Sequence, residues 1–216
     1  MVGIKLPFVL EIELSQIALD DLDSLKRINV AAETRVFENR RALRLADMAP
    51  AGTGDNGRLA ILPLADFGDG CIELDIAGEP GPGAALAARG FVGVAFRVAP
   101  GAESFECFYI RPTNGRAEEQ VRRNHSTQYI SYPGYPWELL REKFPEKYES
   151  YADLVPGELT AVRIEVRGDK AKLYLHGAAQ PTLIVNDLKQ APRHGAIALW
   201  IGPGTIGHFA DLRVSK

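Results

Sequence analysis

The chain has few of the features that would indicate a specialised environment. Its 216 residues include only two cysteines, whereas a disulfide framework or a zinc site needs several at short spacings. No apolar run approaches the ~20 residues of a membrane span, so we expect no membrane span. The net charge of −3 comes without a long basic run, which argues against nucleic acid as a partner.

The N-terminus also lacks the pattern of a secretory leader. One lysine precedes a short apolar run, but Glu11 and Glu13 interrupt it and no cleavage site of small residues follows. The sequence as given therefore predicts a cytoplasmic protein, or a secreted or periplasmic one whose leader was removed. Residues 1–26 show no settled period, and we expect an irregular lead-in or an acidic helical turn there.

Short runs in which apolar and polar positions alternate are abundant, above all after residue 157. ELTAVRIEV, KAKLYLHG, TLIV, GAIALWIG and HFADLRV all have the period of a strand with one buried face. Similar runs start at Ile28, with a tight turn expected at residues 39–40. Glycines and prolines are spread along the chain without a linker. These patterns predict a single all-β domain over residues 1–216, an antiparallel β-sandwich of two sheets.

Three features leave alternatives open. Residues 112–126 are polar and too irregular for an element of their own, and such a long loop is typical of a binding or disordered segment. The run WELLREKF after Pro136 fits either a helical turn or a strand. Cys71 and Cys107 fall inside predicted strands, where we expect two small hydrophobes; a disulfide between them would require neighbouring strands with facing Cβ atoms.

Alternation also assigns side chains to the two faces of a sheet. In the runs at 91–98 and 105–111 the apolar positions pack inward, so the intervening arginines and tyrosine point away. Aromatic plates and planar hydrogen-bond donors suit a sugar ring, although each such residue could instead be solvated or covered by a loop. The predicted ligand-binding residues are Arg97, Tyr109, Arg111, Gln128, Trp137 and Trp200.

Groups that could transfer protons are fewer. Glu73, Asp75 and Glu79 lie along one strand, as catalytic carboxylates do in some β-sandwich glycosidases. The two glutamates are too far apart in sequence for their carboxyl groups to reach the ~5–5.5 Å separation of retaining enzymes. His125 lies at the mouth of the 112–126 loop and is either a general acid–base or a polar loop residue. If the protein is an enzyme, we expect His125 to act with Glu149 or Glu73.

Several stretches together resemble a known superfamily. FGDGCIELDI, RGFVGVAFRV, FYIRPTNG, QYI, KAKLYL, PTLIVNDL, GAIALWIG and HFADLRV are similar to the concanavalin A-like, laminin-G-like jelly rolls over residues 59–214. Within that superfamily they most resemble the bacterial 3-keto-disaccharide hydrolase-like family. The compact Glu-x-Asp-x-Glu of the laminarinase type is absent, so its catalytic apparatus is not implied.

The resemblance implies two stacked sheets with a concave face that handles carbohydrate, and it places Arg97, Tyr109 and Arg111 toward the ligand. It implies no required cofactor, but a structural calcium near the C-terminal strand, for which Asp211 is the candidate. The predicted function is a carbohydrate-recognising jelly roll, either a binding module or a hydrolase acting on a glycoside. The alternative is a non-catalytic laminin-G-like module that binds a protein partner. The oligomeric state stays open.

Overall fold

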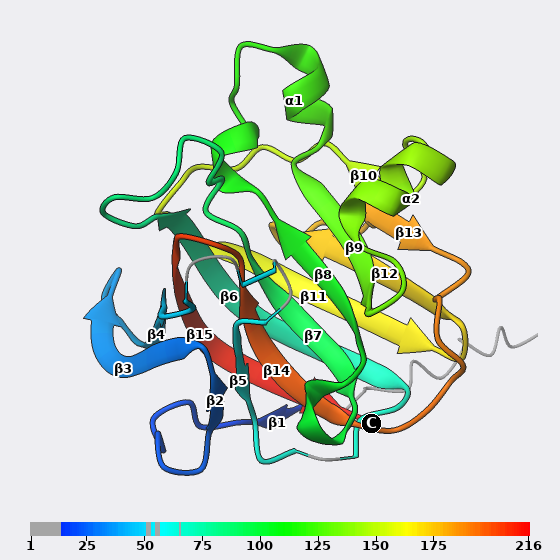
Figure 1. The fold of residues 1–216 in the computed structure, drawn as a ribbon. Helices are drawn as coiled ribbons and strands as arrows, with labels where there is room; N and C mark the ends of the chain where they lie inside the picture. The colour runs from blue at the N-terminus through cyan, green and yellow to red at the C-terminus, as the bar shows by residue number, and fades with distance from the viewer. Residues whose placement is uncertain (1–13, 51–52, 55–56, 65) are drawn as a thin grey trace, which may run out of the picture.

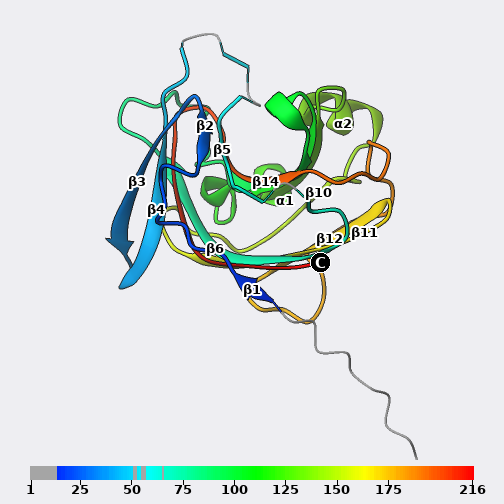
Figure 2. The same cartoon turned by 90° about the horizontal axis from the view of Figure 1, so that it is seen from below.

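The computed structural model describes residues 14–50, 53–54, 57–64 and 66–216, and two antiparallel sheets stack in it as separate layers (Figures 1 and 2). Across the larger sheet the order is β13 (Leu183–Val185), β12 (Lys170–Leu175), β11 (Thr160–Arg167), β6 (Gly70–Pro80), β15 (Thr205–Ser215), β4 (Arg40–Asp47) and β3 (Val30–Phe37), and β1 (Ser15–Gln16) pairs with β15. The predicted all-β sandwich is confirmed.

The smaller sheet has the order β10 (Glu149–Ser150), β9 (Thr127–Tyr132), β8 (Phe105–Ile110), β7 (Val92–Val98), β14 (Ala196–Ile201), β5 (Leu59–Ile61) and β2 (Lys26–Ile28). Four short helical segments connect its strands: η1 (Pro100–Ala102), η2 (Pro112–Asn114), α1 (Gln120–Asn124) and α2 (Trp137–Lys143). Within the described residues no helix is long and apolar enough to cross a bilayer.

The core lies between the sheets and follows the predicted alternation. Phe96 of β7 stacks on Phe108 of β8 with ring centroids 6.2 Å apart. From the larger sheet, the alternate apolar residues of β6 are each at most 3% exposed: Ile72, Leu74 and Ile76. Each large aliphatic side chain buried in this way contributes about 1.5–3 kcal/mol relative to an exposed one.

The second face of the smaller sheet is covered as well. Every residue of β7 and β8 is buried, on both faces of the sheet. Figure 1 shows α2 in front of β9, and Leu140 of α2 is fully buried. The expectation that alternate residues of these strands are displayed to solvent is therefore wrong, because a helix and loops form a third, partial layer.

A β-bulge interrupts the alternation of β7 at Arg97. The register against β14 shifts between Ala196 and Ala198, and Arg97 has a φ of 52°. Its guanidinium donates to the carbonyls of Gly68 and Gly168 and to the carboxylate of Asp69. These acceptors precede β6 and follow β11, so Arg97 links the two sheets. A bulge inserts one residue, and the period of two no longer predicts the face beyond it.

Local corrections follow from turn and helix geometry. The β3–β4 hairpin turns at Glu38 and Asn39, which both have positive φ, one residue before the expected turn. Of the two alternatives for WELLREKF, the helical one is confirmed, over Trp137–Lys143. Part of the 112–126 loop is regular, because it contains η2 and α1.

The two cysteines lie in different sheets and are free thiols. Cys71 belongs to β6 and Cys107 to β8, and both are buried, as expected for small hydrophobes. Burial raises the pKa of the Cys71 thiol to about 11, with a further contribution from Glu73. Burial likewise raises the pKa of Cys107 well above its usual value. The structure therefore has no disulfide between them.

Candidate functional site

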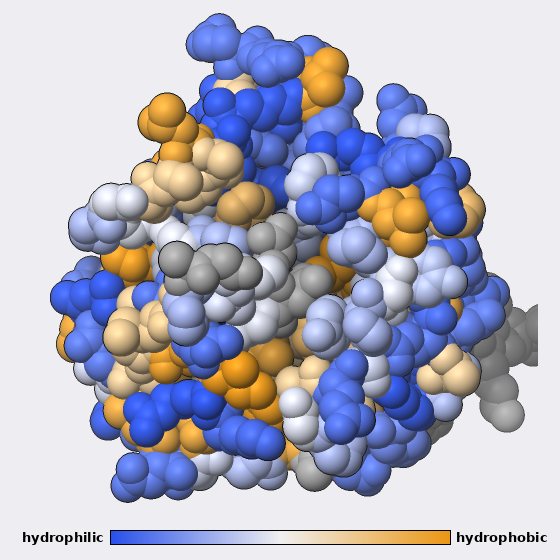
Figure 3. All heavy atoms as spheres, in the orientation of Figure 1, coloured by the Kyte–Doolittle hydropathy of each residue, from blue (hydrophilic) through white to orange (hydrophobic). Residues whose placement is uncertain are grey.

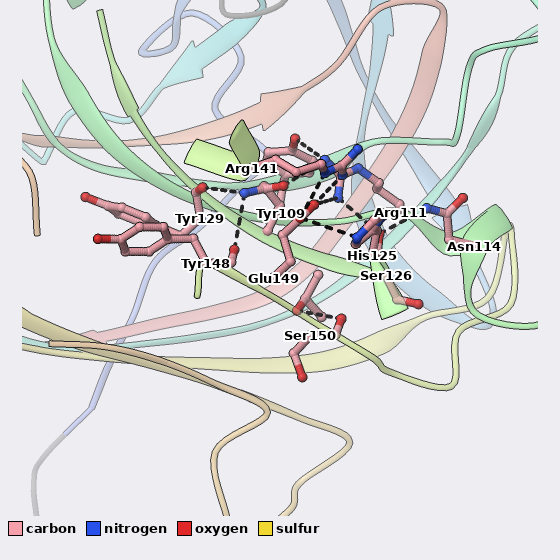
Figure 4. Close-up of polar contacts among 12 residues, drawn as sticks. Tyr109, Arg111, Asn114, His125, Ser126, Tyr129, Arg141, Tyr148, Glu149 and Ser150 are labelled. Carbon is pink, nitrogen blue, oxygen red and sulfur yellow. Dashed lines mark hydrogen bonds and ion pairs between the residues drawn. The ribbon is translucent and has the colours of Figure 1, made fainter. Parts of the chain in front are cut away.

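Arg111, at the end of β8, is the centre of a buried polar cluster (Figure 4). Strand register creates this cluster, because β9 pairs Gln128 with Tyr109 on one side and with Glu149 of β10 on the other. The guanidinium donates to Gln128 Oε1 at 2.9 Å, to Tyr109 Oη at 2.9 Å and to Glu149 Oε1 at 3.2 Å. Tyr109 and Arg111 lie on the same face, as alternation predicts, but both are buried rather than displayed.

Glu149 is held by two arginines. Besides Arg111, Arg141 of α2 contacts both carboxylate oxygens, with its Nε 3.0 Å from Oε2. Such charge-assisted contacts are stronger than neutral hydrogen bonds, and they occupy lone pairs of the carboxylate. The Glu149 side chain is only 3% exposed, so it supports the cluster rather than facing a ligand.

His125 completes the cluster on the side of α1. Its Nε2 lies 3.6 Å from Glu149 Oε2. Burial lowers the pKa of His125; Glu149 opposes this effect, and Arg141 and Arg111 add to it. The imidazole is therefore neutral at neutral pH. A neutral imidazole beside a fixed carboxylate can accept a proton.

The aromatic residues of the site differ in accessibility. Trp137, at the start of α2, is half-buried, and the guanidinium carbons of Arg141 and Arg111 lie 4.6 and 5.7 Å from its ring centroid. Trp200 packs against Tyr109 in a tilted arrangement with ring centroids 4.7 Å apart, and it is only 2% exposed. Trp137 can therefore contact a ligand, whereas Trp200 is covered.

A cavity of about 590 Å³ opens beside this cluster. Three predicted site residues line it: Arg111, His125 and Trp137. Its opposite wall is the loop that follows β6, including Ala88, Arg89 and Phe91. In Figure 3 the segment around α1, at the top of the view, is mostly hydrophilic, and the neighbouring loop after β6 carries apolar residues. The loop after β6 thus contributes both apolar residues and Arg89 to the cavity.

The loop between η2 and β9 forms another wall of the cavity, and hydrogen bonds to one backbone carbonyl hold it in place. Asn114 Nδ2 and Arg111 both donate to the carbonyl oxygen of His125, each at 3.0 Å, which closes the loop between η2 and β9. Arg122 of α1 donates to Asn114 Oδ1 at 3.0 Å and lines the cavity.

Three predicted residues lie elsewhere. Arg97 is 1% exposed and bonded between the sheets, so it belongs to no ligand surface. Glu73 is on the larger sheet, where it pairs with Arg213 at 2.9 Å. Asp211, on the same sheet, contacts Arg40 at 3.1 Å. Within the described part of the chain no three His, Cys, Asp or Glu residues gather as a metal site requires, and a calcium ion at Asp211 stays a prediction.

Sequence reasoning missed Arg141, Arg89 and Phe91. Arg141 is four residues after Trp137, so a helical assignment for WELLREKF would have put the two on one face. Arg89 lies near the end of a segment rich in glycine, proline and alanine that has no period. Phe91 begins the run at 91–98, whose alternation turns it away from the core without indicating a cavity.

Comparisons with known proteins give the fold but no family. No protein-family model matches, and no curated protein does. Solved structures do match, and the following three are 11–12% identical to this chain. The carbohydrate binding module CBM66 from Bacillus subtilis is 11% identical, with 91% of this chain and 98% of that chain covered and a TM-score of 0.53. A protein of unknown function with galectin-like fold from Bacillus subtilis is 11% identical, with 92% and 91% covered and a TM-score of 0.56.

A prokaryotic β-1,3-1,4-glucanase (lichenase) derived from a mouse hindgut metagenome is 12% identical, with 85% of this chain and 82% of that chain covered and a TM-score of 0.50. Likeness at such low identity concerns the fold alone. None of these three structures bears on the 3-keto-disaccharide hydrolase-like family, which stays a prediction. The chain has the jelly-roll β-sandwich fold that these proteins share.

Proposed function

We propose that this protein is a carbohydrate-recognising jelly roll that binds a saccharide in the cavity beside Arg111. One observation carries the proposal: a half-buried tryptophan, Trp137, lines a cavity of about 590 Å³ together with several guanidinium groups. That volume is within the range of small-molecule sites. An indole ring can stack on the apolar C–H face of a pyranose, while planar donors bond its hydroxyls.

Recognition is better supported than hydrolysis. Glycoside hydrolases place two carboxyl groups on either side of the scissile bond. Here Glu149 is fixed by two arginines, and the carboxylate that lines the cavity, Glu119, lies on its exposed rim. Glu73 belongs to the other sheet. We therefore propose a binding module, in which Glu149 orients Arg111 and Arg141.

A second candidate is an enzyme that uses His125 as a general base. It is favoured by the imidazole's place in the cavity wall, 3.6 Å from Glu149, and by the burial that lowers its pKa. A His125→Gln variant separates the two functions, since it would leave saccharide binding within a few-fold of the parent but abolish any turnover. A protein-interaction module is less well supported, because the large hydrophobic residues exposed in the described part come from separate segments.

The test is a thermal-shift screen of mono- and oligosaccharides, including 3-keto sugars, with and without Ca²⁺. A ligand that binds the folded state raises the melting temperature by mass action. Calorimetry then compares the parent with Trp137→Ala, using the saccharide that gives the largest shift. Loss of a stacking ring should weaken binding by about 1 kcal/mol or roughly fivefold.

Tyr151→Ala is the matched control. Tyr151 is an aromatic residue 41% exposed outside the cavity, so its removal should leave the affinity unchanged. If no saccharide shifts the melting temperature, or if Trp137→Ala and Tyr151→Ala bind alike, the proposed site is wrong. A Ca²⁺-dependent shift that Asp211→Asn abolishes would support the predicted calcium.

A further inference from the structure

The charges around the cavity are strongly unequal. Four arginines line it: Arg89, Arg111, Arg122 and Arg141. The carboxylate that lines it is Glu119, which lies on its exposed rim. A cavity lined by one sign of charge concentrates ligands of the other sign.

Two of the four arginines are already paired with a buried carboxylate. Arg111 and Arg141 share Glu149 as their ion-pair partner. Neither Arg89 nor Arg122 forms an ion pair with a carboxylate of the described residues, and each bonds only neutral oxygens. Arg89 donates to backbone carbonyls at positions 86 and 88. Arg122 donates to Asn114 and Thr113.

Both unpaired cations are anchored to the same residue. The amide of Thr113 donates to the Arg89 carbonyl at 3.3 Å. Arg122 Nη2 lies 3.2 Å from the Thr113 carbonyl oxygen and 3.3 Å from its hydroxyl. Thr113 belongs to η2, which is itself fixed by the closed loop of Asn114. The backbone of Arg89 and the side chain of Arg122 are therefore both anchored at Thr113.

Their environment makes an uncompensated charge costly. Both side chains are half-buried, and a partly desolvated cation without a counter-ion is unfavourable. Burial lowers the pKa of Arg89, and the neighbouring charges of Arg122 and Arg111 lower it further. An anionic oxygen between the two guanidinium groups would relieve this repulsion and accept the planar hydrogen bonds that arginine offers.

We propose that the saccharide bound in this cavity carries an anionic substituent, a carboxylate or a sulfate, which Arg89 and Arg122 bind. This inference rests on the proposed carbohydrate function and specifies its ligand class. Trp137 and Arg89 line the same cavity, so the ring of an acidic sugar contacts the indole while its anionic group meets the two arginines. Glu119, on the rim, disfavours a ligand whose anionic group points outward.

The test uses matched pairs of saccharides in calorimetry. Trimers of glucuronate, galacturonate and mannuronate are compared with their carboxyl-reduced counterparts, and sulfated trimers with their unsulfated parents; inorganic sulfate is titrated alone. We expect one acidic trimer to bind at least about tenfold more tightly than its neutral counterpart, equivalent to about 1.4 kcal/mol. Whether the uronate or the sulfated series shows this gap identifies the substituent.

The variant Arg89→Gln/Arg122→Gln should abolish the gap, so that the acidic trimer and its neutral counterpart bind with equal affinity. A control of equal charge change is Arg41→Gln/Arg167→Gln, two exposed arginines of the larger sheet outside the cavity, which should retain the gap. Raising the salt concentration should weaken only the acidic ligand. Circular dichroism establishes that each variant is folded.

The outcomes separate the two proposals. If neutral and acidic partners bind equally, or if the gap survives in Arg89→Gln/Arg122→Gln, the anionic ligand is wrong while carbohydrate recognition stands. If inorganic sulfate binds as tightly as any sulfated trimer, the site recognises a free anion and the inference is overturned. If no saccharide binds at all, the proposed function fails and this inference with it.

Discussion

Replacing Glu149 by glutamine tests whether the buried cluster is as tightly coupled as its geometry indicates. The substitution keeps the shape of the side chain and removes its charge. Glu149 is only 3% exposed and receives Arg111 at 3.2 Å and Arg141 at 3.0 Å. Without the carboxylate, Arg111 becomes a buried cation with only neutral acceptors, Gln128 and Tyr109 among them.

The expected loss of stability depends on how each arginine can respond to the loss of the carboxylate. Removing one partner of a buried ion pair costs about 3–5 kcal/mol, because the other charge is left uncompensated. Two features favour the lower end of that range. Arg141 has a side chain 33% exposed and can turn toward water, and the amide oxygen of glutamine still accepts one hydrogen bond. We expect Glu149→Gln to lose about 3 kcal/mol, a large share of the ~5–15 kcal/mol that stabilises a typical domain.

Urea denaturation followed by circular dichroism measures the effect. Glu165→Gln is the control, since this carboxylate also contacts an arginine, Arg163, but is 40% exposed on the larger sheet. Exposed pairs contribute about 0–1 kcal/mol, so the control should stay within 1 kcal/mol of the parent. The reasoning is refuted if Glu149→Gln loses no more than Glu165→Gln.

Two further predictions concern buried groups outside the site. His208 is 3% exposed, and burial, followed by the charges of Arg35 and Arg44, lowers its pKa to about 4. Between pH 4 and 6.5 the unfolded chain binds the extra proton, so stability is lost as pH falls through that window, by up to about 3 kcal/mol, and His208→Phe should flatten this dependence in parallel urea titrations. The thiols of Cys71 and Cys107 are buried with raised pKa values, so a maleimide at pH 7 should label neither in the folded protein and both in urea; labelling of the native state would contradict the assignment.

The β-sandwich was predictable because its signal is local. An alternating run such as TAVRIEV identifies its buried positions, Val162, Ile164 and Val166, without knowledge of any other strand. Which strands become neighbours is a long-range property. β9 and β10 are separated in the sequence by α2, so the pairing of Gln128 with Glu149 could not be derived from spacing.

The site could be predicted only in part, for two physical reasons. Alternation predicts which side chains share a face, as it did for Tyr109 and Arg111, but it does not predict whether another layer covers that face. It also fails at a bulge, where one extra residue turned Arg97 toward the other sheet. Neither a covering layer nor a bulge has a signature in the composition of β7 or β8.

Because Arg111 is buried, its role in the site differs from the direct ligand contact that the sequence predicts. Both terminal nitrogens of Arg111 are engaged, one with Glu149 and the His125 carbonyl, the other with Tyr109 and Gln128. A guanidinium so occupied gives up little to a ligand, because each new bond would break an existing one in a poorly solvated place. Its function is to hold one wall of the cavity rigid. Direct contact with the ligand then requires arginines that are not already paired with a carboxylate. Arg89 and Arg122 bond only neutral oxygens and meet that condition.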